Sequence, residues 1–160
     1  MLATSGDLLP YTDGALECSA ETTVDSEMVD VFSDAYSSGG HPDDVGYYAL
    51  PVAYSEAFRQ AMPRPPAYAI FAKGSVGGEC VAIASVVLIG KDAGLYSVAT
   101  KHSFRRRGFG RAISMFGLSA ATQRGAANFF LQTEADSPVE EMYEGIGFKR
   151  SFIGQLISPV

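Results

Sequence analysis

The clearest pattern of apolar and polar positions lies in the middle of the chain and predicts three consecutive β-strands. These strands, Tyr68–Lys73, Cys80–Ile89 and Leu95–Thr100, are rich in β-branched and aromatic side chains. Two glycine-containing turns, Gly74–Gly78 and Gly90–Gly94, separate them. Because such short turns join antiparallel neighbours, the segments predict an antiparallel meander, with Cys80–Ile89 as a strand covered on both faces.

A helix is expected after the meander, from about Gly108 to Gln123. Its apolar stripe has the spacing i, i+4, i+7, i+11, and Gly125 stands where a left-handed cap belongs. The stripe consists of Phe109, Ile113, Phe116 and Ala120.

A strand over Phe129–Glu134 and a second helix follow. Ser137 is predicted as the N-cap of this helix, with Pro138 at its first position and Glu140 completing a capping box. The expected inner face consists of Val139, Met142, Tyr143 and Ile146. Gly147-Phe148 then leads into an expected last strand through Phe152 and Ile153.

The first third has weaker signals. Asp25–Tyr36 has helical spacing and is expected to end at Gly39-Gly40, residues 52–61 resemble a second short helix, and Leu16–Ala20 is a candidate strand. Together the elements predict one domain over residues 1–160 of the α+β class, in which helices enclose a mostly antiparallel sheet.

Composition adds a charge asymmetry to this picture. The chain has 160 residues, of which 47% are apolar, and a net charge of −6, which argues against nucleic acid as a partner. Residues 1–66 carry eleven Asp and Glu against Arg59 and Arg64, whereas residues 67–160 carry ten Lys and Arg against seven acids. A cationic substrate near the first part and an anionic cofactor near the second would fit this division, as would solvated faces.

Two cysteines, Cys18 and Cys80, cannot form a disulfide framework and suit a reducing compartment. The first residues lack the basic start and apolar run of a signal peptide, and no apolar run is long enough to cross a bilayer. We therefore expect a cytoplasmic protein that does not associate with membranes. Cys18, His41, Cys80 and His102 lack the spacing of metal ligands, so no metal is expected.

The basic segment Arg105–Arg111 (Arg-Arg-Arg-Gly-Phe-Gly-Arg) carries the strongest chemical signal. Its glycines Gly108 and Gly110 open the helix that follows a strand, so unpaired backbone N–H groups and the positive end of the helix dipole can meet an anion. Arginines beside them can add charge-assisted contacts to phosphates. A dinucleotide fingerprint would need a third glycine where Ile113 stands, and the Gly-Lys-Ser/Thr of a P-loop occurs nowhere.

The stretch Val98–Gly110 resembles the acetyl-coenzyme A motif of the GNAT superfamily of N-acetyltransferases. The family motif Gln/Arg-x-x-Gly-x-Gly/Ala is matched by Arg105-x-x-Gly108-x-Gly110. A second segment, Asp136-x-x-Val139-x-x-Met142-Tyr143-x-x-x-Gly147-Phe148, is similar to the family's Asn-x-x-Ala-x-x-Leu-Tyr-x-x-x-Gly-Phe. The resemblance covers about residues 67–156, and both motifs stand in the family's order.

The resemblance implies a GNAT-like sheet whose two central strands splay apart around the pantetheine arm of acetyl-coenzyme A. It implies that backbone groups of Val98, Ala99 and Thr100 hold the pantetheine and polarise the thioester. It further implies that Tyr143 protonates the departing thiolate. The N–H groups from Arg106 to Arg111 would bind the pyrophosphate. The cofactor-binding residues that the resemblance implies in this segment are Arg105, Arg106, Arg107, Gly108, Phe109, Gly110 and Arg111.

Two features depart from the family pattern. Asp136 replaces an Asn and cannot donate an amide hydrogen bond to the cofactor, so it either contacts the cofactor differently or serves the start of the helix. No family glutamate precedes the motif, which leaves Glu79, Asp92, Glu134 or a water as the base.

Tyr47, Tyr48 and His41 stand where an acceptor loop could lie, although exposed loop residues explain them equally well. The expected activity is acetyl transfer from acetyl-coenzyme A to a primary amine of a small molecule or peptide. A non-catalytic acyl-coenzyme A sensor of the same fold is the alternative, and a homodimer stays open.

Overall fold

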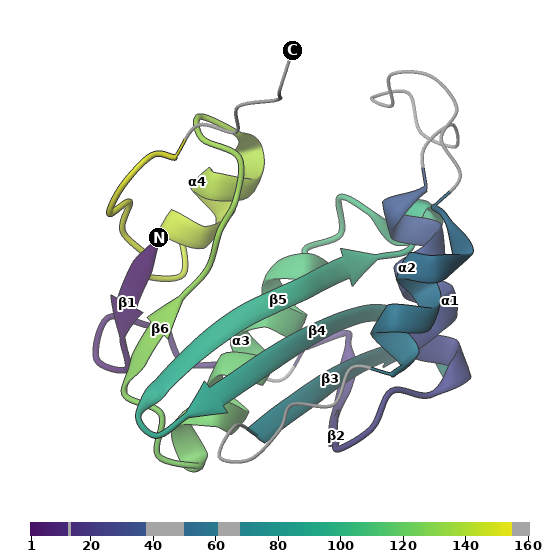
Figure 1. The fold of residues 1–160 in the computed structure, drawn as a ribbon, viewed down its shortest axis with the longest axis horizontal. Coiled ribbons are helices and arrows are strands. Elements are labelled where there is room, and N and C mark those ends of the chain that lie inside the picture. Colours follow the sequence, from purple (N-terminus) through teal and green to yellow (C-terminus); the bar gives the residue numbers. More distant parts are fainter. Residues whose placement is uncertain (13, 38–49, 61–67, 155–160) are drawn as a thin grey trace.

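The computed structural model describes residues 1–12, 14–37, 50–60 and 68–154 (Figure 1). The elements within these ranges are β1 (Leu2–Thr4), β2 (Glu17–Glu21), α1 (Ser26–Tyr36), α2 (Val52–Arg59), β3 (Tyr68–Val76), β4 (Glu79–Ile89), β5 (Asp92–Thr100), a 3-10 turn (His102–Phe104), α3 (Phe109–Gln123), β6 (Asn128–Phe130) and α4 (Pro138–Glu144).

The strands form one sheet in the order β1-β6-β5-β4-β3-β2. Strands β3, β4 and β5 form the predicted antiparallel meander, and β5 and β6 are a parallel pair. The α+β class predicted from the sequence is therefore confirmed. None of the described helices is both long and apolar enough to span a membrane.

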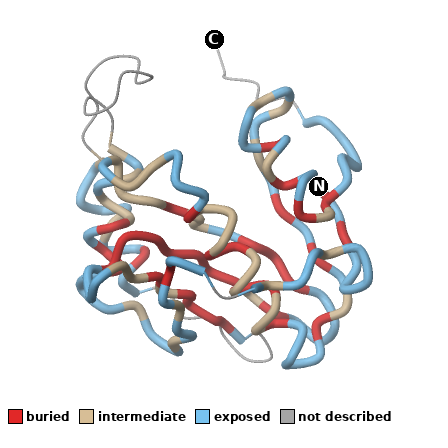
Figure 2. The backbone as a smooth tube through the Cα atoms, turned by 180° about the vertical axis from the view of Figure 1, so that it is seen from behind, coloured by how far each residue is buried: buried red, intermediate tan, exposed pale blue. Residues whose placement is uncertain are grey.

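Helices cover the two faces of this sheet unequally. Helix α3 packs against β3, β4 and β5 on one face, and α1 with α2 covers part of the other (Figure 1). The core on the α3 side includes Ile113, Val86 and Phe129, and a second cluster on the α1 side includes Met28 and Phe71. Buried positions run through the middle of the fold between these layers (Figure 2).

The N-terminal strand β1 has no counterpart in the sequence prediction. It pairs antiparallel with β6, with Leu2 opposite Phe130, and Leu2 also bridges Lys149. Three residues are too short to show a periodicity, and their partners lie more than a hundred residues away. Local pattern therefore could not reveal this strand.

The strand predicted over Phe129–Glu134 is paired only over Asn128–Phe130, and the last strand expected through Phe152 and Ile153 does not form. Residues 151–154 are exposed and carry no ladder hydrogen bonds. Lys149 pairs with Leu2 at the outer edge of β1, but residues 151–154 do not extend this pairing.

The predicted helix starts are confirmed, but the inner faces only in part. On α3, Phe109 and Ile113 are buried as expected, whereas Phe116 and Ala120 are half-buried and the buried face continues through Gly117, Leu118 and Ala121. Asp25 caps α1 by accepting a hydrogen bond from the Met28 N–H, whereas its expected end at Gly39-Gly40 lies outside the described residues. Ser137 caps α4 by accepting from the Glu140 N–H at 3.1 Å. Val139 was expected on the inner face of α4 but is 49% exposed, because this helix has only two turns and buries Tyr143 and Glu140.

Candidate active site

The site begins where two neighbouring strands separate. The pairing of β5 with β6 covers Asp92 to Gly94 and stops there, although β5 continues to Thr100. Beyond Phe130 the chain runs toward α4 while β5 runs toward α1, as Figure 1 shows. We call residues 96–100 the β5 arm and residues 131–136 the β6 arm. The splayed pair expected from the sequence is present.

A β-bulge reshapes the β5 arm. Tyr96 pairs with Ser85 and Ala99 pairs with Ile83, so Ser97 and Val98 together face the single residue Ala84 of β4. Ser97 has a left-handed φ of 49°, which turns the strand at this point. Val98 consequently has no single residue opposite it in the register with β4, and its carbonyl accepts a hydrogen bond from outside the sheet, from the Tyr36 hydroxyl.

Helix α3 begins directly after this arm with an open N-terminus. Its N-cap Gly108 has φ 80° and no side-chain capping bond. A Cβ placed on Gly108 would meet no protein atom within 4 Å, so free space lies beside the first turn. Unpaired N–H groups, a positive helix end and free space together form a geometry suited to a phosphate.

The basic side chains near this helix end divide into two groups. Arg105 donates to the Ala35 carbonyl at 2.7 Å, Lys101 pairs with Glu79 at 2.8 Å, and Arg107 lies over the Phe104 ring. These three are engaged with the protein. Arg106 and Arg111 have no ion-pair partner among the described residues. They are the cations of this segment that a ligand could meet without displacing an existing contact.

The end of α1 is attached to the same loop, which the sequence did not indicate. The Asp34 carboxylate accepts from the backbone N–H of His102 at 2.7 Å, and His102 Nδ1 lies 3.1 Å from it. The Tyr36 hydroxyl donates to the Val98 carbonyl at 3.3 Å. Tyr36 therefore lies at the bulge of the β5 arm, where the amphipathic pattern of α1 had indicated only a packing residue.

Tyr143 lies on α4, close to Ser114 of α3. Its side chain is buried and its ring lies 6.0 Å from the Phe148 ring. Burial raises the pKa of the phenol to about 12, with a smaller opposing effect from the Ser114 hydroxyl. The phenol therefore stays protonated in neutral solution and can donate a proton but cannot act as a base.

Asp136 lies at the end of the β6 arm in an ion network. Arg150 donates to the Asp136 carboxylate at 2.7 Å and binds Glu140 through both Nε and Nη2. The backbone N–H of Asp136 donates to Glu140 at 2.8 Å, and these hydrogen bonds, led by that of Arg150, lower the pKa of Glu140. Ser137, and not Asp136, caps α4. The Asp136 carboxylate is paired with Arg150 instead.

The candidate bases occupy different places. Glu79 is paired with Lys101, and Asp92 accepts from the Asn128 side chain at 2.8 Å where β5 and β6 are still paired. Glu134 belongs to the β6 arm and has no ion-pair partner among the described residues. Tyr47, Tyr48 and His41 lie outside the described residues. No cluster that could hold a metal ion occurs within the described ranges.

Comparisons with known proteins agree with this geometry. The family model described as FR47-like protein matches residues 73–154, which is slightly more than half of the chain. No curated protein sequence matches the chain.

Several solved structures share the fold. A GCN5-related N-acetyltransferase from Kribbella flavida has 21% identity and a TM-score of 0.58, over 92% of this chain and 52% of that protein. The ribosomal-protein-S18-alanine N-acetyltransferase of Escherichia coli has 16% identity and a TM-score of 0.60, over 85% and 80% of the two chains. An aminoglycoside acetyltransferase, HMB0005, from an uncultured soil metagenomic sample has 17% identity and a TM-score of 0.61, over 92% and 100%.

At these identities the likeness establishes the fold and not the substrate. The chain spans about half the length of the Kribbella flavida protein.

Proposed function

This chain belongs to the FR47-like family of the GNAT superfamily, and we propose that it transfers an acetyl group from acetyl-coenzyme A to a primary amine of a small molecule or peptide. One observation carries the proposal. Residues 98–110 lead from a strand with a β-bulge at Ser97 and Val98, through a 3-10 turn, to an uncapped helix N-terminus at Gly108. A thioester site and a phosphate site would therefore follow each other along one continuous segment.

The donor would lie along this segment and between the two arms. The N–H groups from Arg106 to Arg111 would bind the pyrophosphate, with the arginines Arg106 and Arg111 adding charge. The backbone of Val98, Ala99 and Thr100 would bind the pantetheine. We assign Arg105 the role of fixing the loop through the Ala35 carbonyl.

On the β6 arm, the Asp136 carboxylate could only accept a hydrogen bond from the pantetheine. It would do so while paired with Arg150.

The reaction would begin with the acceptor amine, which must lose one proton to solvent or a nearby base before it attacks. Its nitrogen bonds to the thioester carbonyl carbon and the carbon–sulfur bond breaks. The Val98 N–H can stabilise the negative charge on the carbonyl oxygen, an effect of a few kcal/mol, typically about 3–4, in comparable sites. Tyr143 gives its proton to the leaving thiolate, and the second proton of the amine returns the phenol to its starting state.

Thiol release from acetyl-coenzyme A tests the proposal, measured with and without a panel of amines, with the acetylated product identified by mass spectrometry. We expect release that depends on the amine, in equal amounts with an N-acetyl product. Tight binding of acetyl-coenzyme A with no amine-dependent release would contradict catalysis. It would favour the sensor alternative, which is consistent with the ion-paired state of Glu79 and Asp136.

A further inference from the structure

A buried hydroxyl group, that of Ser114, lies next to the proposed proton donor Tyr143. Ser114 is in the second turn of α3 and is 0% exposed, although serine side chains are mostly found at the surface. Tyr143 is 6% exposed. The Ser114 side chain forms a hydrogen bond that lowers the pKa of the Tyr143 phenol, against the larger effect of burial. A hydroxyl of α3 and a phenol of α4 therefore meet in the interior.

Contacts beside this pair fix how α4 lies on α3. A Cβ placed on Gly110 would lie 4.0 Å from Met142 Sδ and 3.7 Å from Thr100 Oγ1. A Cβ placed on Gly145 would lie 3.1 Å from Arg111 Nη1. The first turn of α3 therefore contacts both the end of the β5 arm, at Thr100, and helix α4.

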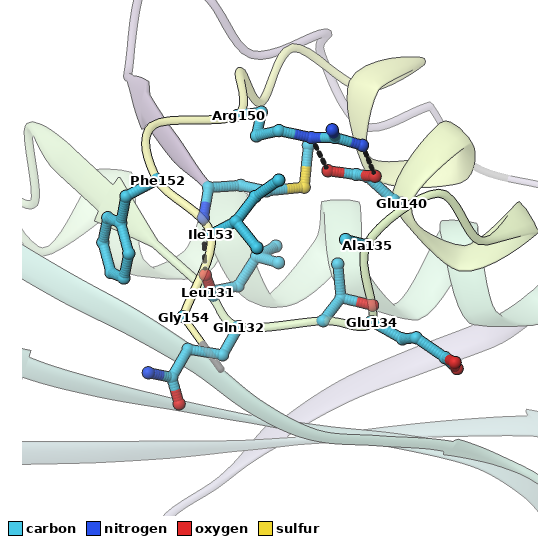
Figure 3. A pocket seen from close by; sticks show the side chains of 11 residues that line it. Leu131, Gln132, Glu134, Ala135, Glu140, Arg150, Phe152, Ile153 and Gly154 are labelled. Carbon is cyan, nitrogen blue, oxygen red and sulfur yellow. Dashed lines mark hydrogen bonds and ion pairs between the residues drawn. The ribbon is translucent and has the colours of Figure 1, made fainter. Parts of the chain in front are cut away.

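Helix α4 is also held at its start. Figure 3 shows Arg150 reaching Glu140, whose two oxygens accept from its guanidinium. Glu140 and Tyr143 are three residues apart and are the buried residues of this helix. Because α4 is held both by Arg150 and by its contacts with α3, the Tyr143 phenol has a fixed position beside Ser114.

Tyr36 relates the Tyr143 phenol to the β5 arm. The Tyr36 hydroxyl donates to the Val98 carbonyl at 3.3 Å. An ionised Tyr36 would raise the pKa of Tyr143, so the two phenols lie within electrostatic range of each other. The buried phenol is therefore within electrostatic range of a residue that contacts the bulge, where the thioester is proposed to bind.

Ser114 has one hydroxyl proton and two acceptors for it. In the structure the hydroxyl donates to the Gly110 carbonyl at 2.8 Å, one turn earlier in α3. The same carbonyl also accepts the backbone N–H of Ser114 within the helix, so it keeps a partner when the hydroxyl turns away. A neutral Tyr143 can donate to the Ser114 oxygen, whereas an ionised Tyr143 needs a donor.

We propose that Ser114 is a positioning residue, which holds the Tyr143 phenol for proton transfer and then stabilises the phenolate. When the phenol proton moves to the leaving thiolate, the Ser114 O–H turns from Gly110 to the phenolate oxygen and keeps its own proton. Without this bond a charge would be buried unpaired, which is costly. The second proton of the acceptor amine then restores the phenol. This inference rests on the proposed transferase activity and adds a residue to its mechanism.

Ser114→Ala tests the role, with Thr122→Val as the matched control. The Thr122 hydroxyl makes the same kind of bond, to the Leu118 carbonyl at 2.9 Å, two turns further along α3. We expect Ser114→Ala to lower kcat about tenfold, the effect of losing a hydrogen bond to a charged group. The KM for the amine and the Kd for acetyl-coenzyme A should stay within about threefold of wild type, and Thr122→Val should leave kcat within about twofold.

A double variant separates positioning from damage to the fold. In the Tyr143→Phe background there is no phenol to position, so adding Ser114→Ala should leave kcat within about twofold. An equal loss of kcat with and without the phenol would overturn the inference, because it would show that Ser114 serves only the packing. An unchanged kcat in Ser114→Ala alone would overturn it as well.

A fluorinated phenol measures the hydrogen bond independently of catalysis. Incorporation of 3,5-difluorotyrosine at position 143 of the full chain makes the phenol ionise at a lower pH, and fluorine NMR follows that ionisation. Adding Ser114→Ala should move its midpoint to a pH about one unit higher, a tenfold change in the ionisation constant. Thr122→Val should not move it. Equal midpoints with and without the Ser114 hydroxyl would overturn the inference.

The two proposals fail separately. Without amine-dependent thiol release the proposed function is wrong, and the fluorine titration still decides whether Ser114 stabilises the phenolate. If thiol release depends on the amine while kcat and the midpoint are both insensitive to Ser114→Ala, the proposed function stands and the role of Ser114 is wrong.

Discussion

The two arms differ in the groups that they can offer to a ligand, which are backbone groups on the β5 arm and side chains on the β6 arm. The β5 arm offers backbone groups, at the bulge of Ser97 and Val98 and at the open N-terminus of α3 beyond it. The β6 arm offers side chains instead, with Asp136 paired with Arg150 and Glu134 exposed. Backbone sites depend on glycines and spacing, whereas side-chain sites depend on which distant segments come together.

This difference explains why the donor and the acceptor are not equally visible in the sequence. Phosphate and thioester recognition by N–H groups requires a local pattern, and Arg105-x-x-Gly108-x-Gly110 is such a pattern. The side chains of the β6 arm lie beside residues that are distant in the sequence, such as Met1, Phe152 and Ile153, and no local pattern predicts that arrangement. The contrast between the arms can be tested from both sides.

Gly108→Val should disrupt the β5 arm most strongly. A branched residue at φ 80° costs about 1–3 kcal/mol of strain and would project into the space beside the helix N-terminus. We expect acetyl-coenzyme A affinity to fall about 100-fold by calorimetry, from strain and steric exclusion together. Gly78→Val is the matched control, because Gly78 has φ 83° and equally open surroundings in the turn between β3 and β4. Equal affinity in both variants would refute the phosphate site.

Tyr143→Phe should separate chemistry from donor binding. The phenol, with a pKa of about 12, would be the proton donor to the thiolate, so its removal should lower kcat about 10- to 100-fold. The Kd for acetyl-coenzyme A should change little. Tyr68→Phe is the control, since its ring lies against Arg124, away from the arms. An unchanged kcat would remove the assigned role.

Because the Tyr143 phenol is buried, the free energy of unfolding should fall at alkaline pH. An unfolded tyrosine ionises near pH 10 and Tyr143 in the fold near 12, so the unfolded state binds fewer protons between these values and stability falls as pH rises. At pH 11 wild type should lose about 1.4 kcal/mol more than Tyr143→Phe, relative to pH 9. Urea unfolding of both proteins measures this, and parallel losses would show that the pKa is not raised.

Tyr36→Phe should have the smallest effect of these substitutions, and it tests whether the Val98 carbonyl of the β5 arm binds the donor. The Tyr36 hydroxyl occupies the Val98 carbonyl, which the pantetheine is proposed to use. Because one such hydrogen bond contributes about 0.5–1.5 kcal/mol, its loss should tighten acetyl-coenzyme A binding about two- to tenfold. Weaker binding would instead mean that Tyr36 supports the donor site.

Sequence reasoning succeeded where the signal is local. The meander of β3 to β5, the start of α4 at Ser137 and the family motifs were all predicted from neighbouring residues. The roles of the predicted donor residues and of Tyr143 stay predictions.

The missed features all depend on contacts between distant segments. Strand β1 pairs with a partner more than a hundred residues away, and Tyr36 reaches Val98 from the end of α1. The Arg105 guanidinium likewise contacts the carbonyl of Ala35, 70 positions earlier in the chain. A single sequence holds no signal for such contacts, because each residue also fits an ordinary surface or core position.

A crystal structure of the complex with acetyl-coenzyme A tests the central claim most directly. We expect the pyrophosphate on the N–H groups of residues 106–111, the pantetheine between the β5 and β6 arms, and the thioester carbonyl next to Val98. Acetyl-coenzyme A bound away from the β5 arm, or pyrophosphate density with no contact to the α3 N-terminus, would contradict it.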